Sequence, residues 1–138
     1  MKEFLHSQRL YLLTLAILVI IVYFNALNNV FLSDDIAEIR DNPNVGNLWY
    51  AITSHPFGFI RLFFYWIAYQ IGGLNPIFFR LINLFLHTGS VFLLYLILHL
   101  LYKSKKIAFF ASALFAVHPA ISEAVVWISG GGYPQYTF

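Results

Sequence analysis

Two adjacent carboxylates, Asp34 and Asp35, are the first residues of this sequence that could do chemistry. They stand in a loop, 31–45, that holds four of the six acidic residues of the chain. A positioned carboxylate can act as a general base and take the proton of a hydroxyl group. Two neighbouring carboxylates can also hold a divalent cation, or one can raise the pKa of the other. The sequence leaves these roles open, together with that of a solvated helix cap.

A second group of candidate residues follows farther along the chain. Arg80, Asn83 and His87 recur at helical spacing in an apolar stretch. Such polar groups usually face protein rather than lipid. For Asn83 and His87, hydrogen bonding between helices is at least as good an explanation as substrate binding. His118 and Glu123 could cap and solvate a short helix, or they could line the same cavity as the acidic loop.

The composition indicates a membrane protein. Of the 138 residues, 60% are hydrophobic and 10% are charged, whereas about a quarter of the residues of a soluble domain are charged. The chain has no cysteine, so disulfides, thiolate nucleophiles and cysteine metal sites are excluded. The net charge of +2 is small, and the basic residues form no stripe that could follow a phosphate backbone. Nucleic acid is therefore not an expected partner.

Three apolar stretches are expected to cross the membrane. Residues 10–27 contain two polar side chains and, at about 1.5 Å per residue, would form about 27 Å of helix. No A-x-A-like cleavage site follows this stretch, so it is expected to be an uncleaved signal anchor. Residues 77–102 are the second predicted span, and the shorter run 104–117 is the third.

The aromatic segment 48–73 is expected to be a helix that lies along the outer membrane surface. Its uninterrupted apolar part between Arg61 and Gln70 has only eight residues, which is too short to cross. Tryptophan and tyrosine also prefer the headgroup level. In the preceding loop, Ser33 is a candidate N-cap for a short helix that Asn42-Pro43 ends. The predicted fold class is an all-α membrane protein with three transmembrane helices and short interfacial helices in the outer loops.

Lysine and arginine residues set the expected orientation. Five of them, near the N-terminus and at 103–106, lie on one side of the predicted spans, against Arg40 and Arg61 on the other side. The positive-inside rule then places the N-terminus in the cytoplasm. The acidic loop and Glu123 come out on the periplasmic, extracellular or lumenal side.

The landmarks above resemble the N-terminal part of the multi-spanning GT-C type glycosyltransferases, especially the protein O-mannosyltransferase relatives with tetratricopeptide repeats. The resemblance covers most of the chain. Its motifs are Asp34-Asp35 with Asn42-Pro43-x-Val45, Gly73-Leu-Asn-Pro76 with Arg80-x-x-Asn83-x-x-x-His87, and His118-Pro119-x-x-x-Glu123-Ala-Val-x-Trp127-Ile-Ser-Gly130. Two positions depart from the family: Arg61-Leu62-Phe63 replaces its usual Arg-Pro-Leu, and Gly130-Gly-Gly-Tyr133 replaces its frequent Gly-Arg-x-Asp.

The resemblance implies that residues 1–138 are the N-terminal fragment of one transmembrane domain, without a separate soluble domain. It implies sugar transfer from a polyprenyl or dolichyl phosphate donor to an acceptor hydroxyl on a protein, within membrane lipid. Asp34 or Asp35 would be the catalytic base, and a divalent cation at this pair stays open. The candidate substrate-binding residues are Arg80, His118, Glu123, Asn83 and His87. The missing arginine after Gly130 leaves the contact with the lipid phosphate unassigned.

A non-catalytic scaffold subunit or a small transporter is the alternative class of function. Many secondary transporters have Gly- or Pro-broken spans at mid-membrane and paired repeats. Here the glycine and proline residues other than Gly89 lie at or beyond the ends of the predicted spans, which favours the enzyme. The fragment alone is expected to be inactive, because three spans cannot surround both a polyprenyl phosphate and an acceptor.

Overall fold

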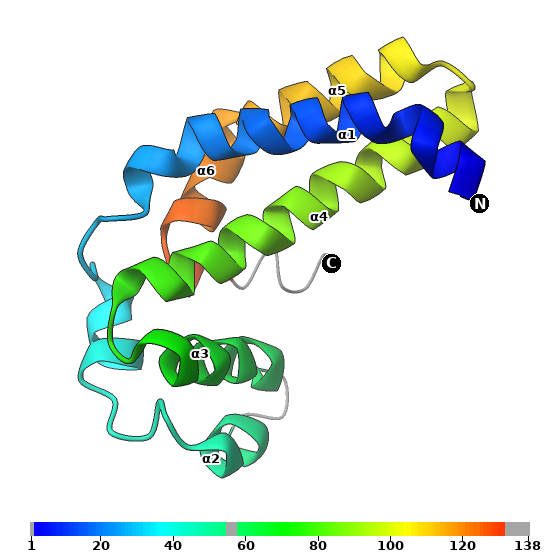
Figure 1. Cartoon of the computed structure of the whole chain (residues 1–138). Helices are drawn as coiled ribbons and strands as arrows, with labels where there is room; N and C mark the ends of the chain where they lie inside the picture. Colours follow the sequence, from blue (N-terminus) through cyan, green and yellow to red (C-terminus); the bar gives the residue numbers. More distant parts are fainter. Residues whose placement is uncertain (1, 55–57, 132–138) are drawn as a thin grey trace.

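The computed structural model describes residues 2–54 and 58–131, and every element in these ranges is helical (Figure 1). The elements are α1 (Lys2–Tyr23), η1 (Phe24–Ala26), η2 (Ile36–Arg40), α2 (Leu48–Thr53), α3 (Phe59–Gly72), α4 (Pro76–Tyr102), α5 (Lys105–Val117), α6 (Pro119–Val126) and η3 (Ser129–Gly131). Helices α1, α4 and α5 form an elongated bundle, α3 lies beside the first half of α4, and α2 packs against α3 (Figure 1).

Two helical segments of the described chain are long and apolar enough to cross a membrane. They are Gln8–Ala26, with 19 residues, and Pro76–Tyr102, with 27 residues. These segments confirm the predicted all-α membrane fold and lie close to the predicted spans 10–27 and 77–102. The predicted span 104–117 is also a helix, but α5 has only 13 residues. It reaches the length of a span only together with α6, from which it is bent by 58°.

Pro119 accounts for the bend between α5 and α6. Proline has no N–H, so it cannot continue the hydrogen-bond ladder of α5. The chain starts a new helix instead, and the His118 side chain caps it by accepting a hydrogen bond from Ala120 N at 3.2 Å. As a consequence, the segment after α6 turns back toward the outer loop.

The core of the bundle depends on small residues of α5. Ala108, Ser112 and Ala116 are buried one turn apart on this helix, and small side chains let neighbouring helices approach closely. Larger side chains of the other two helices fill the remaining space, among them Leu15 of α1 and Tyr95 of α4, both fully buried.

A second hydrophobic core holds η2, α3, the start of α4 and the segment after α6 together. Ile39 of η2, Tyr65 of α3, Phe79 of α4 and Ile128 after α6 are all buried in it. The ring of Phe79 lies 5.8 Å from the ring of Phe31 and 6.0 Å from that of Tyr65, measured between centroids. The acidic loop is therefore held against α3 and α4 by apolar packing.

The outer segments differ from the prediction in two details. The aromatic segment 48–73 forms two short helices, α2 and α3, instead of one, and Asn47 caps α2 by accepting a hydrogen bond from Tyr50 N at 3.2 Å. Ser33 is not an N-cap, because its backbone is left-handed with φ of 51° and its side chain bonds Asp34. The predicted end of the loop helix is confirmed, since Asn42 Nδ2 donates to Glu38 O at 3.0 Å.

Candidate active site

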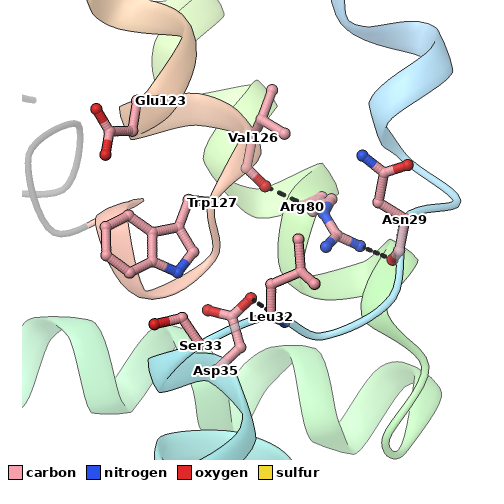
Figure 2. A pocket seen from close by; sticks show the side chains of 8 residues that line it. All are labelled: Asn29, Leu32, Ser33, Asp35, Arg80, Glu123, Val126 and Trp127. Atoms are coloured by element: carbon pink, nitrogen blue, oxygen red, sulfur yellow. Dashed lines mark hydrogen bonds between the residues drawn. The ribbon is translucent and has the colours of Figure 1, made fainter.

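A cavity of about 310 Å³ lies between the loop that joins η1 to η2, α4 and the end of α6. It is lined by Asn29, Leu32, Ser33, Asp35, Arg80, Glu123, Val126 and Trp127 (Figure 2). Three predicted candidates, Asp35, Arg80 and Glu123, thus meet at one place although they are distant in sequence. The start of α4 and the loop before η2, which carry several of the lining residues, lie at the end of the molecule opposite the N-terminus (Figure 1).

Asp35 is fully buried in the wall of this cavity. Its Oδ1 accepts a hydrogen bond from Ser129 N at 2.8 Å, and its Oδ2 accepts one from Leu32 N at 3.3 Å. A buried carboxylate without such donors would destabilise the fold strongly. The two bonds fix the orientation of the carboxylate and leave further lone pairs on both oxygens. The bond to Ser129 also joins residues 94 positions apart in the sequence.

Asp34 has different surroundings from its neighbour. Its side chain is exposed, and its Oδ1 accepts a hydrogen bond from Ser33 Oγ at 3.3 Å. Asp34 is not among the residues that line the cavity. Within the described ranges, no three His, Asp or Glu side chains gather as a metal site would require. The structure therefore separates the two carboxylates that the sequence could not tell apart.

Arg80 joins the acidic loop to the end of α6. It is 3% exposed, and its Nε donates to Val126 O at 3.1 Å. Its Nη2 donates to Val30 O at 2.8 Å, and its Nη1 donates to Asn29 O. A guanidinium group has five N–H bonds, so two of them take no part in these contacts. Arg80 thus holds two walls of the cavity together and keeps donors for an anionic group.

Asn83 and His87 lie farther along α4 and do not line this cavity. Both are buried. His87 Nε2 and Tyr23 Oη each donate to Ala116 O at 3.2 Å. This carbonyl lacks its usual helical donor because of the bend after α5, so the contacts of His87 are those of a structural residue. Asn83 Nδ2 is buried without a hydrogen-bond partner among the described residues.

His118 and Glu123, the other two predicted site residues, are both exposed. His118 is the N-cap of α6 and is not part of the cavity lining. Glu123 lines the cavity at its rim, and Figure 2 shows its carboxylate pointing away from Arg80.

Trp127 is a cavity residue to which the sequence reasoning assigned no role. Its Nε1 is buried and has no hydrogen-bond partner among the described residues. Figure 2 shows the indole nitrogen on the side of the ring that faces Asp35. A buried donor without an acceptor costs about 1–3 kcal/mol, and an oxygen atom of a bound ligand would remove that cost. The sequence signal was its place in the family motif that runs from His118 to Gly130, one helical turn after Glu123.

Comparison with known proteins places these residues in context. No family model and no solved structure matches the chain. The protein O-mannosyl-transferase Tmtc1 of Drosophila melanogaster is 31% identical over 129 residues, which cover 82% of this chain and 15% of that protein. The protein O-mannosyl-transferase F38B6.6 of Caenorhabditis elegans is 30% identical over 138 residues, covering 86% of this chain and 20% of that protein.

Mouse TMTC1, another protein O-mannosyl-transferase, is 30% identical over 126 residues, covering 78% of this chain and 13% of that protein. The chain thus spans about an eighth to a fifth of the length of these relatives. The predicted relationship to part of the protein O-mannosyltransferases is confirmed.

The contacts of Arg80 predict that Arg80→Lys destabilises the protein by more than about 2 kcal/mol, because a single ammonium group cannot reach all three carbonyl oxygens and each charge-assisted bond contributes about 1.5–3 kcal/mol. Thermal unfolding in detergent measures the change. Arg9→Lys, at an exposed position of α1, is the matched control and should unfold like the wild type. Equal unfolding of the two variants would show that the three contacts do not hold the loop.

Proposed function

We propose that this chain is the N-terminal part of a GT-C type membrane glycosyltransferase that transfers a sugar from a polyprenyl or dolichyl phosphate to a hydroxyl group of a protein. Asp35 is the general base of the reaction. The names of the relatives support transferase activity and make mannose the first sugar to test. We base the role of Asp35 on its position: its carboxylate is fixed by two backbone donors in the wall of a cavity.

The groups around the cavity suit the steps of such a transfer. In a transfer with inversion, the hydroxyl oxygen of the acceptor bonds to the anomeric carbon while its proton passes to Asp35. The bond between that carbon and the phosphate oxygen breaks, and the lipid phosphate leaves with the electron pair. The two remaining N–H bonds of Arg80 can stabilise the negative charge on the leaving phosphate.

Two further residues complete the proposed site. Trp127 Nε1 offers a donor without a partner among the described residues, which suits an oxygen of the sugar or the phosphate. Glu123, on the rim, can accept hydrogen bonds from sugar hydroxyls. His87 and His118 make structural contacts, and Asn83 does not line the cavity, so these three residues are left outside the proposed substrate contacts.

A non-catalytic scaffold is the second candidate function. One observation favours it: backbone groups already bond both oxygens of Asp35 and three N–H bonds of Arg80. The two side chains can therefore hold the outer loop in place without any substrate. A substitution that keeps the size of the Asp35 side chain but removes its basicity distinguishes the two functions.

Asp35→Asn, in the full-length protein that contains this segment, is expected to lower sugar transfer about 10²- to 10⁴-fold, the usual contribution of a positioned general base. Asparagine is nearly isosteric with aspartate, and its Oδ1 can still accept one of the two backbone bonds. Transfer of mannose from dolichyl phosphate mannose to a hydroxyl-bearing peptide is measured in membranes. Asp34→Asn is the matched control and should retain near-normal turnover. Normal turnover in both variants would favour the scaffold.

We further propose that the cavity faces the periplasm, the extracellular space or the lumen, with the N-terminus in the cytoplasm. The N-terminus and the α4–α5 connection lie at the same end of the bundle (Figure 1), so the basic residues of both segments lie together. A hydrogen-bond distance of 3.1 Å between Gln8 Nε2 and His99 Nε2 joins the two segments. Both sets of positive charges can then lie on the cytoplasmic side.

Cysteine labelling tests this orientation in a chain that has no natural cysteine. Asn44 and Lys106 are both exposed. The turn before α2 and the start of α5, to which they belong, lie at opposite ends of the molecule (Figure 1). In sealed vesicles with the cytoplasmic face outside, a membrane-impermeant maleimide should label Lys106→Cys at once. It should label Asn44→Cys only after the vesicles are permeabilised. The reverse pattern would contradict the proposed orientation.

A further inference from the structure

A second cavity, of about 370 Å³, lies between η2, the turn that follows it, α2 and α3. It is lined by Ala37, Glu38, Asp41, Asn42, Pro43, Tyr50, Arg61 and Leu62. None of these residues lines the cavity of Asp35. Its volume falls within the range of about 300–1,000 Å³ typical of small-molecule sites. The proposed function makes no use of this second cavity.

The ion pair between Arg61 and Glu38 forms one wall of the second cavity, and one donor of Arg61 has no acceptor among the described residues. Arg61 Nη1 lies 3.0 Å from Glu38 Oε2 and 3.4 Å from Oε1. Arg61 Nε is buried and has no hydrogen-bond partner among the described residues. The guanidinium carbon lies 5.9 Å from the centre of the Tyr65 ring, which holds the side chain in place. Arg61 is therefore positioned, and its Nε–H needs an acceptor that the described residues do not supply.

The charge of the lining decides which ligand suits this site. Two carboxylates, Glu38 and Asp41, stand against one guanidinium group, that of Arg61. Asp41 is further bonded to Arg40 at 2.8 Å and 3.1 Å, which lowers the pKa of Asp41 and keeps it ionised. The charge of Asp41 is thus offset by Arg40 and that of Glu38 by Arg61, so no net positive charge remains to hold a phosphate or carboxylate ligand. A neutral ligand with several hydroxyl groups suits such a site.

Hydroxyl groups can satisfy both members of the ion pair at once. One hydroxyl oxygen can accept from Arg61 Nε while a neighbouring hydroxyl donates to Glu38, since a carboxylate accepts several bonds. Tyr50 and Leu62 add an aromatic ring and an apolar side chain to the lining, and these can cover the C–H face of a sugar ring. Sites that bind a pyranose ring typically combine planar polar side chains with an aromatic ring.

We propose that the second cavity binds a neutral sugar ring, separately from the cavity of Asp35. Because η2 begins directly after Asp35 and carries Glu38, the bound sugar lies next to the proposed reaction site. This inference goes beyond the proposed function, since binding at the second cavity requires neither Asp35 nor transfer of a sugar.

Saturation-transfer difference NMR with methyl α-D-mannopyranoside, on the full chain in lipid nanodiscs, tests the proposal. The wild type should give a saturable signal. Arg61→Lys keeps the charge but loses the Nε donor, so its signal should fall at least fivefold. Glu38→Gln keeps the size but loses the charge, and its signal should fall as well. Arg9→Lys, at an exposed position of α1 that lines neither cavity, is the matched control and should keep the wild-type signal.

Four outcomes would overturn the proposal: no signal from the wild type, an unchanged signal from both folded cavity variants, an equal loss of the signal in Arg9→Lys, or displacement of the sugar by inorganic phosphate at equal concentration. Near-ultraviolet circular dichroism checks that each variant is folded, and Glu38→Gln decides the test if Arg61→Lys does not fold. A negative result in this binding test would leave the proposal that sugar transfer depends on Asp35 unchanged. The failure of one proposal is therefore distinguishable from the failure of the other.

Discussion

The hydrogen bond from Ser129 N to Asp35 Oδ1 is the constraint on which the outer half of this molecule depends. A buried carboxylate must find donors, because its desolvation would otherwise oppose folding strongly. Here one of its donors comes from the far end of the described chain, so the acidic loop can fold only against the segment that follows α6. Arg80 acts in parallel by bonding backbone carbonyls of the loop and of Val126. The cavity is the space between the two segments that these side chains hold together.

The bend after α5 brings Ser129 N, the donor to Asp35, into place. Pro119 interrupts the helix, and the chain then turns toward α4 instead of continuing along the bundle. The interruption leaves Ala116 O without its helical donor, and His87 and Tyr23 bond to this carbonyl from two neighbouring helices. His87 therefore supports the site from a distance. Its role is to hold α4 and α5 together rather than to contact the substrate.

Much of the fold could be predicted from the sequence because it depends on local composition. Two apolar runs of the sequence are long enough to cross a bilayer, and their predicted limits lie within two residues of the limits of the helical segments in the structure. Ser33 was assigned wrongly as a cap, because its left-handed backbone follows from the packing of the whole loop. Asp34 and Asp35 could not be told apart, since what buries Asp35 is a contact with Ser129. Arg80 was expected to face protein, but its three carbonyl partners belong to segments whose positions no local pattern reveals.

Chemical rescue tests most directly whether Asp35 supplies the base. Asp35→Ala in the full-length protein removes the carboxylate and leaves space beside a cavity of about 310 Å³, into which acetate can diffuse. If Asp35 takes the proton of the acceptor, transfer by this variant should be very slow and should rise with acetate concentration, while acetate leaves Arg80→Lys unchanged. A folded Asp35→Ala protein that transfers sugar at the wild-type rate without acetate, or that acetate does not restore at all, would contradict the account.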